Sequence, residues 1–468
     1  MSSETGYRIP RIWSIAVVPL LIGGCGLFTG VTRETVPAVE AETETIDTEQ
    51  LLETVQQLIG RGEYEEALAV YREVWVSIPH TPENRLLLAR LLMLSGRFDE
   101  ARDELTTLIN DGAESAEVFY VLSLVEEAVG DQDAQRQFLM RVIEEDPDHA
   151  DGLAKLAEIY HEEDAEIAET YYRRALVADP GNLASLLGLG RLVAEQGRAE
   201  EAFSLFERAI EIAPDYPFAY VDRAHVMTAL GDLTGALSDL TTAIDLMPDY
   251  YWNYIDRGRL YLQNMKRKEA FDDFTTAISV APEMFVAYVY RARMNFQNER
   301  YPEALQDYQK LYSLRPDYYF AYPPLGVLYY MEGEWELARD MFQKAIQYDF
   351  QEYGYHLLIA LTFRKEKREE EAIQFLTDLL PAIPRESWYF DVARLLHDGS
   401  SLRFVENRVR DNAGASLPKS RMMFYLASHE KLQGNYRTAH AYLLDSLEVF
   451  EGDYLERRIA HWELNELE

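Results

Sequence analysis

Residues 183–216 read LASLLGLGRLVAEQGRAEEAFSLFERAIEIAPDY, and this stretch decides the fold. In both halves, apolar or small side chains recur every three or four residues, which is the spacing of one helix face. These side chains are Leu186, Leu189, Gly190 and Val193 in the first half, and Ala202, Phe206, Ala209 and Ile210 in the second. Gly197 between the halves supplies the backbone freedom of a tight turn, and Pro214 ends the second half. The stretch therefore predicts a hairpin of two helices.

The same pattern recurs along the chain with a period of about 34 residues, a length typical of repeats built from two helices. Prolines mark the ends of successive units at an almost constant interval, at Pro147, Pro180, Pro214, Pro248, Pro282 and Pro316. A second series is alanine, at Ala67, Ala101, Ala168, Ala202, Ala236, Ala270, Ala304, Ala338 and Ala372. Because two residue types keep one period, we expect a tandem array of hairpins.

The units resemble tetratricopeptide repeats. The small residue, the turn glycine, the alanine and the terminal proline that mark these repeats are present as Ala224, Gly231, Ala236 and Pro248 in one unit. Another unit has Gly326, Gly333, Trp335, Ala338 and Phe342. The resemblance implies an all-α fold, a right-handed α-solenoid (superhelix) of helical hairpins with a C-terminal capping helix.

The repeat pattern divides the chain into six segments. We expect ten tandem repeats at 48–386, a degenerate repeat at 387–419, a further repeat at 420–452 and a capping helix at 453–468. The other two segments, 1–24 and 25–47, precede the repeats.

The single cysteine, Cys25, follows an apolar run and two glycines. The stretch Leu21-Ile22-Gly23-Gly24-Cys25 resembles the lipobox of bacterial lipoproteins. That resemblance implies that 1–24 is a signal peptide cleaved before Cys25, and that lipid is attached to the sulfur and new amino terminus of Cys25. The segment 25–47 would then be a lipidated acidic tether that anchors the chain in a membrane. Gly26, in place of an aspartate, is typical of outer-membrane members of that family and implies a periplasmic or cell-surface location. The alternative is an uncleaved apolar anchor that extends to Phe28 and keeps a free thiol.

The charge balance limits the possible partners. The chain has 81 acidic and 45 basic residues and a formal net charge of −36, which argues against nucleic acid as a partner. One cysteine excludes an intramolecular disulfide and a zinc site built from cysteines. Neither a nucleotide-binding loop nor a zinc-protease motif is present, so we expect no cofactor, no metal and no enzyme activity.

Three units carry an arginine on the first helix and an aspartate sixteen residues later, whereas other units hold apolar residues there, such as Leu189 and Leu205. The pairs are Arg223 with Asp239, Arg257 with Asp273, and Arg291 with Asp307. We expect each pair to be a structural ion pair across its hairpin.

A second set of residues suggests a binding surface. The family resemblance places Arg191, His225, Arg259 and Arg293 on the concave groove, where repeats of this kind bind extended peptides. Other groove candidates are aromatic: Phe218, Trp252, Phe296, Phe320 and Tyr330. Such a lining suits a partner with carboxylates and apolar side chains. The alternative is local pairing, of Arg259 with Asp256 and of His225 with Asp222.

The sequence is compatible with three functions. The leading one is a noncatalytic scaffold that binds protein or peptide partners and supports assembly of a cell-envelope complex. The second is a glycan-binding component of polysaccharide export or cell-wall machinery. The third is an enzyme with a site in the degenerate repeat, near His397, Asp398 and Arg403.

Overall fold

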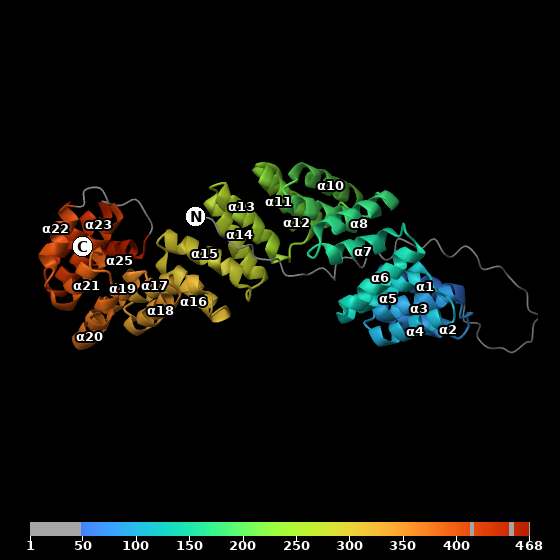
Figure 1. The fold of residues 1–468 in the computed structure, drawn as a ribbon, viewed down its shortest axis with the longest axis horizontal. Helices are drawn as coiled ribbons and strands as arrows, with labels where there is room; N and C mark the ends of the chain where they lie inside the picture. Colours follow the sequence, from blue (N-terminus) through green and yellow to red (C-terminus); the bar gives the residue numbers. More distant parts are fainter. Residues whose placement is uncertain (1–47, 412–415, 449–453, 468) are drawn as a thin grey trace, which may run out of the picture. The chain divides into compact units, whose positions relative to one another are not determined.

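The structure is a computed structural model of the 468-residue chain, and it describes residues 48–411, 416–448 and 454–467. Over these residues it contains 25 α-helices and no strand, so the predicted all-α solenoid class is confirmed (Figure 1). The chain divides into two compact units, Met1–Pro214 and Asp215–Glu468.

The described part of the first unit consists of five helical hairpins. Its helices are α1 (Thr48–Gly60), α2 (Tyr64–Trp75), α3 (Pro82–Leu94), α4 (Phe98–Asn110), α5 (Ala116–Val129), α6 (Gln132–Glu145), α7 (Ala150–Tyr160), α8 (Ala165–Ala178), α9 (Leu183–Glu195) and α10 (Ala199–Ile212).

The second unit continues the hairpins and ends in a single helix. Its first helices are α11 (Pro217–Leu230), α12 (Leu233–Leu246), α13 (Tyr251–Gln263), α14 (Arg267–Val280), α15 (Phe285–Gln297), α16 (Tyr301–Leu314), the short η2 (Tyr319–Ala321), α17 (Tyr322–Met331) and α18 (Trp335–Tyr348). They are followed by α19 (Tyr353–Lys365), α20 (Glu369–Leu379), the short η3 (Leu380–Ala382), α21 (Trp388–Asp398), α22 (Leu402–Asp411), α23 (Ser416–Leu432), α24 (Tyr436–Glu448) and α25 (Leu455–Asn465).

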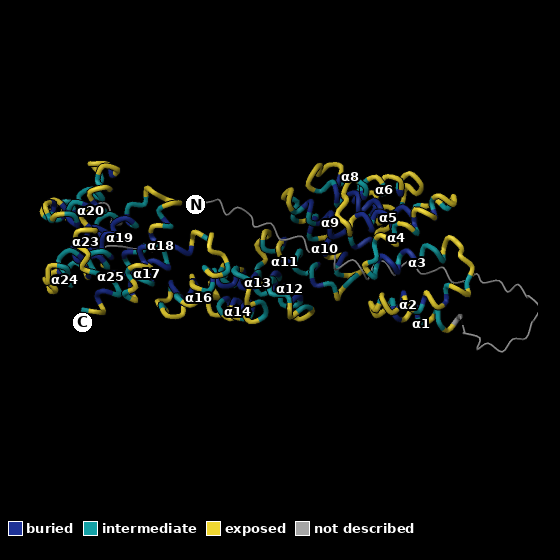
Figure 2. The backbone as a smooth tube through the Cα atoms, turned by 90° about the horizontal axis from the view of Figure 1, so that it is seen from below, coloured by how far each residue is buried: buried dark blue, intermediate teal, exposed yellow. Residues whose placement is uncertain are grey.

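A small residue on the first helix of a hairpin lies under a large residue on the second. A Cβ atom added to Gly190 would be 2.6 Å from the Phe206 ring, and one added to Gly258 would be 2.7 Å from the Phe274 ring. Both phenylalanines are buried. Close approach of the two helices therefore depends on the pairing of glycine with an aromatic residue. Buried and exposed segments alternate along the helices of each unit (Figure 2).

The hairpin turns use the left-handed backbone conformation. Glycine provides it at Gly197, with φ 78°, at Gly231, with φ 85°, and at Gly333, with φ 77°. At two of the turns between these, the equivalent place is held by Met265, with φ 58°, and Glu299, with φ 60°. The turn geometry is thus set by the repeat and not by glycine alone.

The helices can be placed on the segments read from the sequence, and one boundary differs, because α23 begins at Ser416, inside the stretch 387–419. Ten hairpins, α1 to α20, lie within 48–386. The stretch 387–419, which the sequence pattern marks as degenerate, also forms a hairpin, α21 with α22. The predicted capping helix, α25, covers α24 but also lies against α17, far back in the chain.

The signal peptide, the tether and Cys25 lie outside the described residues. Within the described ranges, none of the helices has the length and hydropathy that crossing a bilayer requires.

Candidate protein-interaction groove

The three predicted ion pairs are present in the structure. In each, the guanidinium donates one hydrogen bond to each oxygen of the aspartate, in the bidentate geometry that suits this pairing. The distances are 2.7 and 2.8 Å for Arg223–Asp239, 2.9 and 2.7 Å for Arg257–Asp273, and 3.0 and 2.6 Å for Arg291–Asp307. The aspartate side chains are only 6–8% exposed, so these pairs belong to the scaffold and are not open to a ligand.

Each of these arginines also lies over a tyrosine ring three residues earlier in the chain. The guanidinium carbon is 5.8 to 5.9 Å from the ring centroid of Tyr220, Tyr254 or Tyr288. Sequence reasoning missed this third member, although its recurrence once in each repeat period could have revealed it. The repeated group is therefore an aspartate, an arginine and a tyrosine.

Burial and pairing act against each other in these groups. Burial raises the pKa of Asp273 above its ordinary value, although the Arg257 charge and hydrogen bonds favour the ionised form. The hydrogen bonds to Asp273 in turn raise the pKa of Arg257. For the Asp273 carboxyl, the cost of burial therefore outweighs the effect of its arginine partner.

The basic column of the second unit consists of His225, Arg259 and Arg293, on α11, α13 and α15. The side chains of His225 and Arg259 are 47% and 54% exposed, and both approach one carboxylate. His225 Nε2 is 3.5 Å from Asp256 Oδ2, and Arg259 Nη1 is 3.6 Å from Asp256 Oδ1. The column is therefore accessible and only loosely held by long ion pairs.

The predicted local pairing is right for Arg259 but wrong for His225. The ion-pair partner of His225 is Asp256 on the next hairpin, and Asp222 acts on it through charge. Although burial would lower it, the pKa of His225 is raised because Asp256 and Asp222 stabilise the imidazolium. Arg293 is exposed and has no ion pair or hydrogen bond within the described residues. Arg191, in the first unit, is half-buried; burial raises the pKa of Glu158, and the charges of Lys155 and Arg191 only partly oppose this rise.

Three of the aromatic candidates are accessible. Phe218 and Trp252 are half-buried and belong to a chain of ring contacts that runs through Tyr250 and Tyr251. Phe320, in η2, is 59% exposed. These rings lie at or just before the amino-terminal ends of α11, α13 and α17, so they occupy equivalent places in their repeats.

The other two aromatic candidates are covered by α25. Tyr330 is completely buried; its hydroxyl donates to Glu463 Oε1 at 3.2 Å, and its ring is 6.5 Å from that of Trp462. Phe296 is 6% exposed and lies under the Arg458 guanidinium, at 5.5 Å. The two rings are therefore not open to a partner while α25 is in place.

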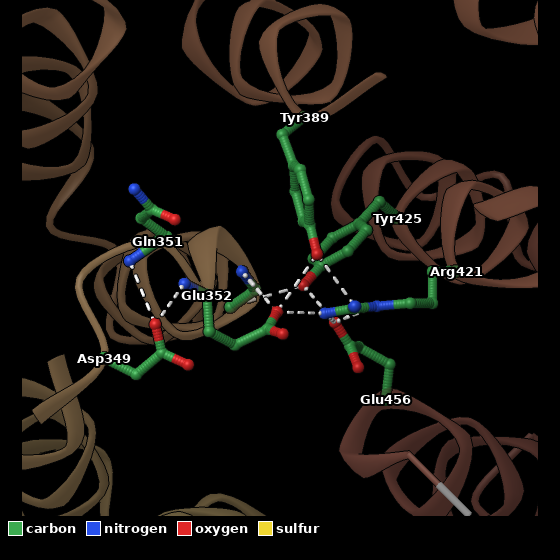
Figure 3. A network of polar contacts seen from close by, with 8 residues as sticks. Asp349, Gln351, Glu352, Tyr389, Arg421, Tyr425 and Glu456 are labelled. Atoms are coloured by element: carbon green, nitrogen blue, oxygen red, sulfur yellow. Dashed lines mark hydrogen bonds and ion pairs between the residues drawn. The ribbon is translucent and has the colours of Figure 1, made fainter. Parts of the chain in front are cut away.

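Arg421 on α23 is the centre of the polar network that holds the start of α25 (Figure 3). Its Nε and Nη2 donate to Glu456 Oε1 at 2.9 and 2.6 Å, and Nη2 also donates to Glu352 Oε1 at 2.7 Å. The hydroxyls of Tyr425 and Tyr389 complete it by donating to Glu456 at 2.9 Å and Glu352 at 3.0 Å. One buried arginine thus joins α19, α21, α23 and α25.

A second carboxylate holds the end of α25. Glu463 is fully buried, and its Oε1 accepts from Lys365 Nζ at 2.7 Å. Lys431 Nζ is 3.5 Å from its other oxygen. Although burial would raise it, the pKa of Glu463 is lowered because the two ammonium charges and the Tyr330 hydroxyl favour the ionised form.

Sequence reasoning missed all of these groups. The available signal was Glu456 and Glu463, seven residues and about two helical turns apart, with Ile459 and Ala460 between them on the same face. That pattern indicates a helix with a charged but buried face. It does not indicate the surface against which the helix packs.

Two residues of the enzyme hypothesis, His397 and Asp398, lie together at the end of α21. His397 Nε2 is 3.0 Å from Thr377 Oγ1, and its Nδ1 is 3.5 Å from Asp398. Arg403 is exposed at the start of α22. Among the described side chains, no group of three or more His, Cys, Asp and Glu residues is placed to hold a metal ion.

Comparison with known proteins gives partial matches. Over 159 residues the chain is 29% identical to the human Protein O-mannosyl-transferase TMTC1, which covers 33% of this chain and 18% of that protein, so the chain spans less than a fifth of this relative. Among solved structures, PilF of Pseudomonas aeruginosa is 20% identical, covers 46% of this chain and 94% of its own, and has a TM-score of 0.39. A tetratricopeptide repeat protein of Parabacteroides merdae is 18% identical, covers 53% and 98%, and has a TM-score of 0.39.

Models of the tetratricopeptide repeat match three parts of the chain, at 58–125, 160–217 and 255–319. In whole or in part, these matches include helices α2 to α5, α8 to α10 and α13 to α16 of the structure. The chain therefore contains tetratricopeptide repeats.

Proposed function

We propose that this protein is a noncatalytic scaffold that binds protein or peptide partners in the groove of its repeats. The proposal rests on the accessible column of His225, Arg259 and Arg293. The rings of Phe218 and Trp252 are on the same helices as His225 and Arg259. Repeats of this class act by protein interaction. The cations would pair with carboxylates of the partner, and the rings would contact its apolar side chains.

Crosslinking in intact cells, followed by recovery of the protein, tests this groove. The variant Arg259→Glu/Arg293→Glu reverses two exposed charges and is expected to lose the partners that the wild type recovers. A matched control is Lys268→Glu/Arg385→Glu, which reverses two exposed charges outside the column. Equal recovery by wild type and by both variants would contradict the proposal.

We further propose that the scaffold is lipid-anchored through Cys25 in a bacterial cell envelope, at the outer membrane, where it supports assembly of an envelope complex. The lipobox-like stretch 21–25 supports this. Cys25→Ser removes the only thiol of the chain, so the variant is expected to move from the membrane to the soluble fraction and to lose incorporation of labelled fatty acid. An unchanged membrane fraction would instead favour the uncleaved apolar anchor.

A second candidate is glycan binding, favoured by exposed, stacked rings at the start of α17. The rings of Tyr319 and Tyr348 are 4.8 Å apart and close to parallel, and these residues are 40% and 56% exposed. Flat exposed rings suit the apolar faces of sugars. Binding of cell-wall or capsular oligosaccharides by wild type, lost in Tyr319→Ala/Phe320→Ala but kept in Arg259→Glu/Arg293→Glu, would replace the protein-binding proposal.

A further inference from the structure

Helix α25 lies across the first helices of several hairpins in the second unit, where a groove ligand would lie. It contacts α17 and α23 directly. It reaches α15 through Arg458, which donates to the carbonyl of Gln297 at 3.2 Å, and α19 through Glu463 and Lys365, at 2.7 Å. A helix that only capped the last hairpin would need contacts with α23 and α24 alone.

The groove under α25 recognises it mainly by charge. The two carboxylates Glu456 and Glu463 face three cations of the groove, Arg421, Lys365 and Lys431. Between the carboxylates, Ile459 and Ala460 are fully buried. The groove therefore binds a helix face that has two acidic groups two helical turns apart, with small or branched apolar side chains between them.

Packing of α25 is incomplete for a permanent part of a core. The Oε2 atom of Glu463 is buried without a hydrogen bond, and its partner is the Lys431 ammonium at 3.5 Å, a long ion pair. A cleft of about 510 Å³ that opens to solvent lies beside the helix, lined by Arg267 and Gln297 from earlier hairpins and by His461 and Leu464 of α25. Buried ion pairs give specificity with little net stability. These features favour a helix that can leave its place.

We propose that α25 is a built-in, displaceable ligand of the groove formed by α15, α17, α19, α21 and α23. The partner of this surface is a helix with the same chemistry: two carboxylates seven residues apart, with apolar side chains between them. Such a helix displaces α25 and takes its contacts to Arg421, Lys365 and Lys431. This inference deepens the proposed function, and it concerns a different surface from the column of His225, Arg259 and Arg293.

The test uses the purified full chain and a fluorescent peptide of residues 454–467. The variant Glu456→Gln/Glu463→Gln weakens docking of its own α25, which frees the groove. It is expected to bind the peptide about tenfold or more tightly than wild type does, because the wild-type groove is occupied. A peptide with the same two substitutions is expected to bind weakly, and adding Lys365→Gln to the variant is expected to reduce binding of the unchanged peptide.

Hydrogen exchange on the wild type provides a measurement that needs no variant. Excess unlabelled peptide is expected to speed exchange of the α25 amides while those of α23 stay protected. The proposal is overturned if α25 exchange is unchanged by saturating peptide, or if the folded glutamine variant binds no better than wild type; α25 is then a fixed cap. Because both measurements use the chain's own peptide, failure here leaves the Arg259 and Arg293 test unaffected.

Discussion

Among the residues that the structure describes, three other than glycine hold the left-handed conformation at hairpin turns: Met265, Glu299 and Lys367. Each stands one repeat period from a glycine in the same role, Gly231 or Gly333. A side chain with a Cβ in this conformation costs roughly 1–2 kcal/mol. Packing of the two helices of each repeat requires this turn conformation, so these residues adopt it despite the strain.

Replacing Met265 by glycine is therefore expected to stabilise the protein. Met265 is 80% exposed, so the change removes strain and little packing. After allowing for the greater freedom of glycine in the unfolded chain, we expect a gain of up to about 1 kcal/mol. The midpoint of urea denaturation measures it, with Gly231→Ala as the control of opposite sign. A midpoint lowered by Met265→Gly would contradict the strain argument.

Gly354 is expected to tolerate no side chain. A Cβ there would be 2.8 Å from Glu352 Oε1 and 2.9 Å from Glu456 Oε1, and would also meet Arg421. Gly354→Ala should therefore cost about 1–3 kcal/mol by displacing the buried network. Gly60→Ala is the matched control, since a Cβ at Gly60 meets nothing within 4 Å. Equal melting temperatures for the two variants would show that the network can rearrange.

At the scale of helices, one repeat of the chain has an apolar pair at the positions where other repeats have the buried ion pair. Leu189 and Leu205, both buried, stand where the next repeats have arginine and aspartate. We therefore expect Arg257→Leu or Asp273→Leu alone to cost about 3–5 kcal/mol, because each leaves an uncompensated buried charge.

The double variant Arg257→Leu/Asp273→Leu should be close to wild type in stability, since an apolar pair replaces the ionic one. A thermodynamic cycle of the four proteins, measured by denaturant unfolding, gives the coupling between the two positions. Additive losses, with no coupling, would mean that the two groups act independently.

The sequence predicts helices and hairpins well because the same pattern of residues recurs in each repeat. The small residue, the turn and the terminal proline recur once in every period, so even a weak unit is placed by its neighbours. The hairpin in 387–419 was harder to predict because its second helix is only 10 residues long and arginine-rich. Its turn does begin with a left-handed glycine, Gly399, directly after α21.

Contacts between repeats are much harder to predict from the sequence than the helices and hairpins are. Local spacing suggested Asp222 as the partner of His225, but stacking of the hairpins brings Asp256 to it from the next one. The position of α25 has no periodic signal at all. Glu463 meets Lys365, almost a hundred residues away, and only the curvature of several hairpins together brings them close.

For the molecule as a whole, acid is expected to weaken the hold on α25. The pKa of Glu463 is lowered from its ordinary 4.5 in the folded state, so its ionisation stabilises the fold above about pH 4.5 and this contribution is lost as the pH falls through the lower folded value. The pKa of Glu352 is also lowered, by Arg421 against the effect of burial, so it acts in the same direction.

Melting temperatures of wild type and Glu463→Gln between pH 6 and pH 3 measure this effect. The glutamine variant is expected to melt lower at pH 6, and the difference should shrink as the pH falls below 4.5, because the wild-type carboxyl then becomes neutral too. A constant difference over this range would show that the charge of Glu463 is unimportant.

The return of α25 to α15 and α17 also has a mechanical consequence. A linear array of repeats frays from its end, one hairpin at a time, since each hairpin touches only its neighbours. Here the end is fastened to hairpins several repeats earlier, so a pulling force on the carboxyl terminus is shared by α15, α17, α19 and α23 together. Under a pulling force, we expect these hairpins to unfold together in one cooperative step, and not one hairpin at a time.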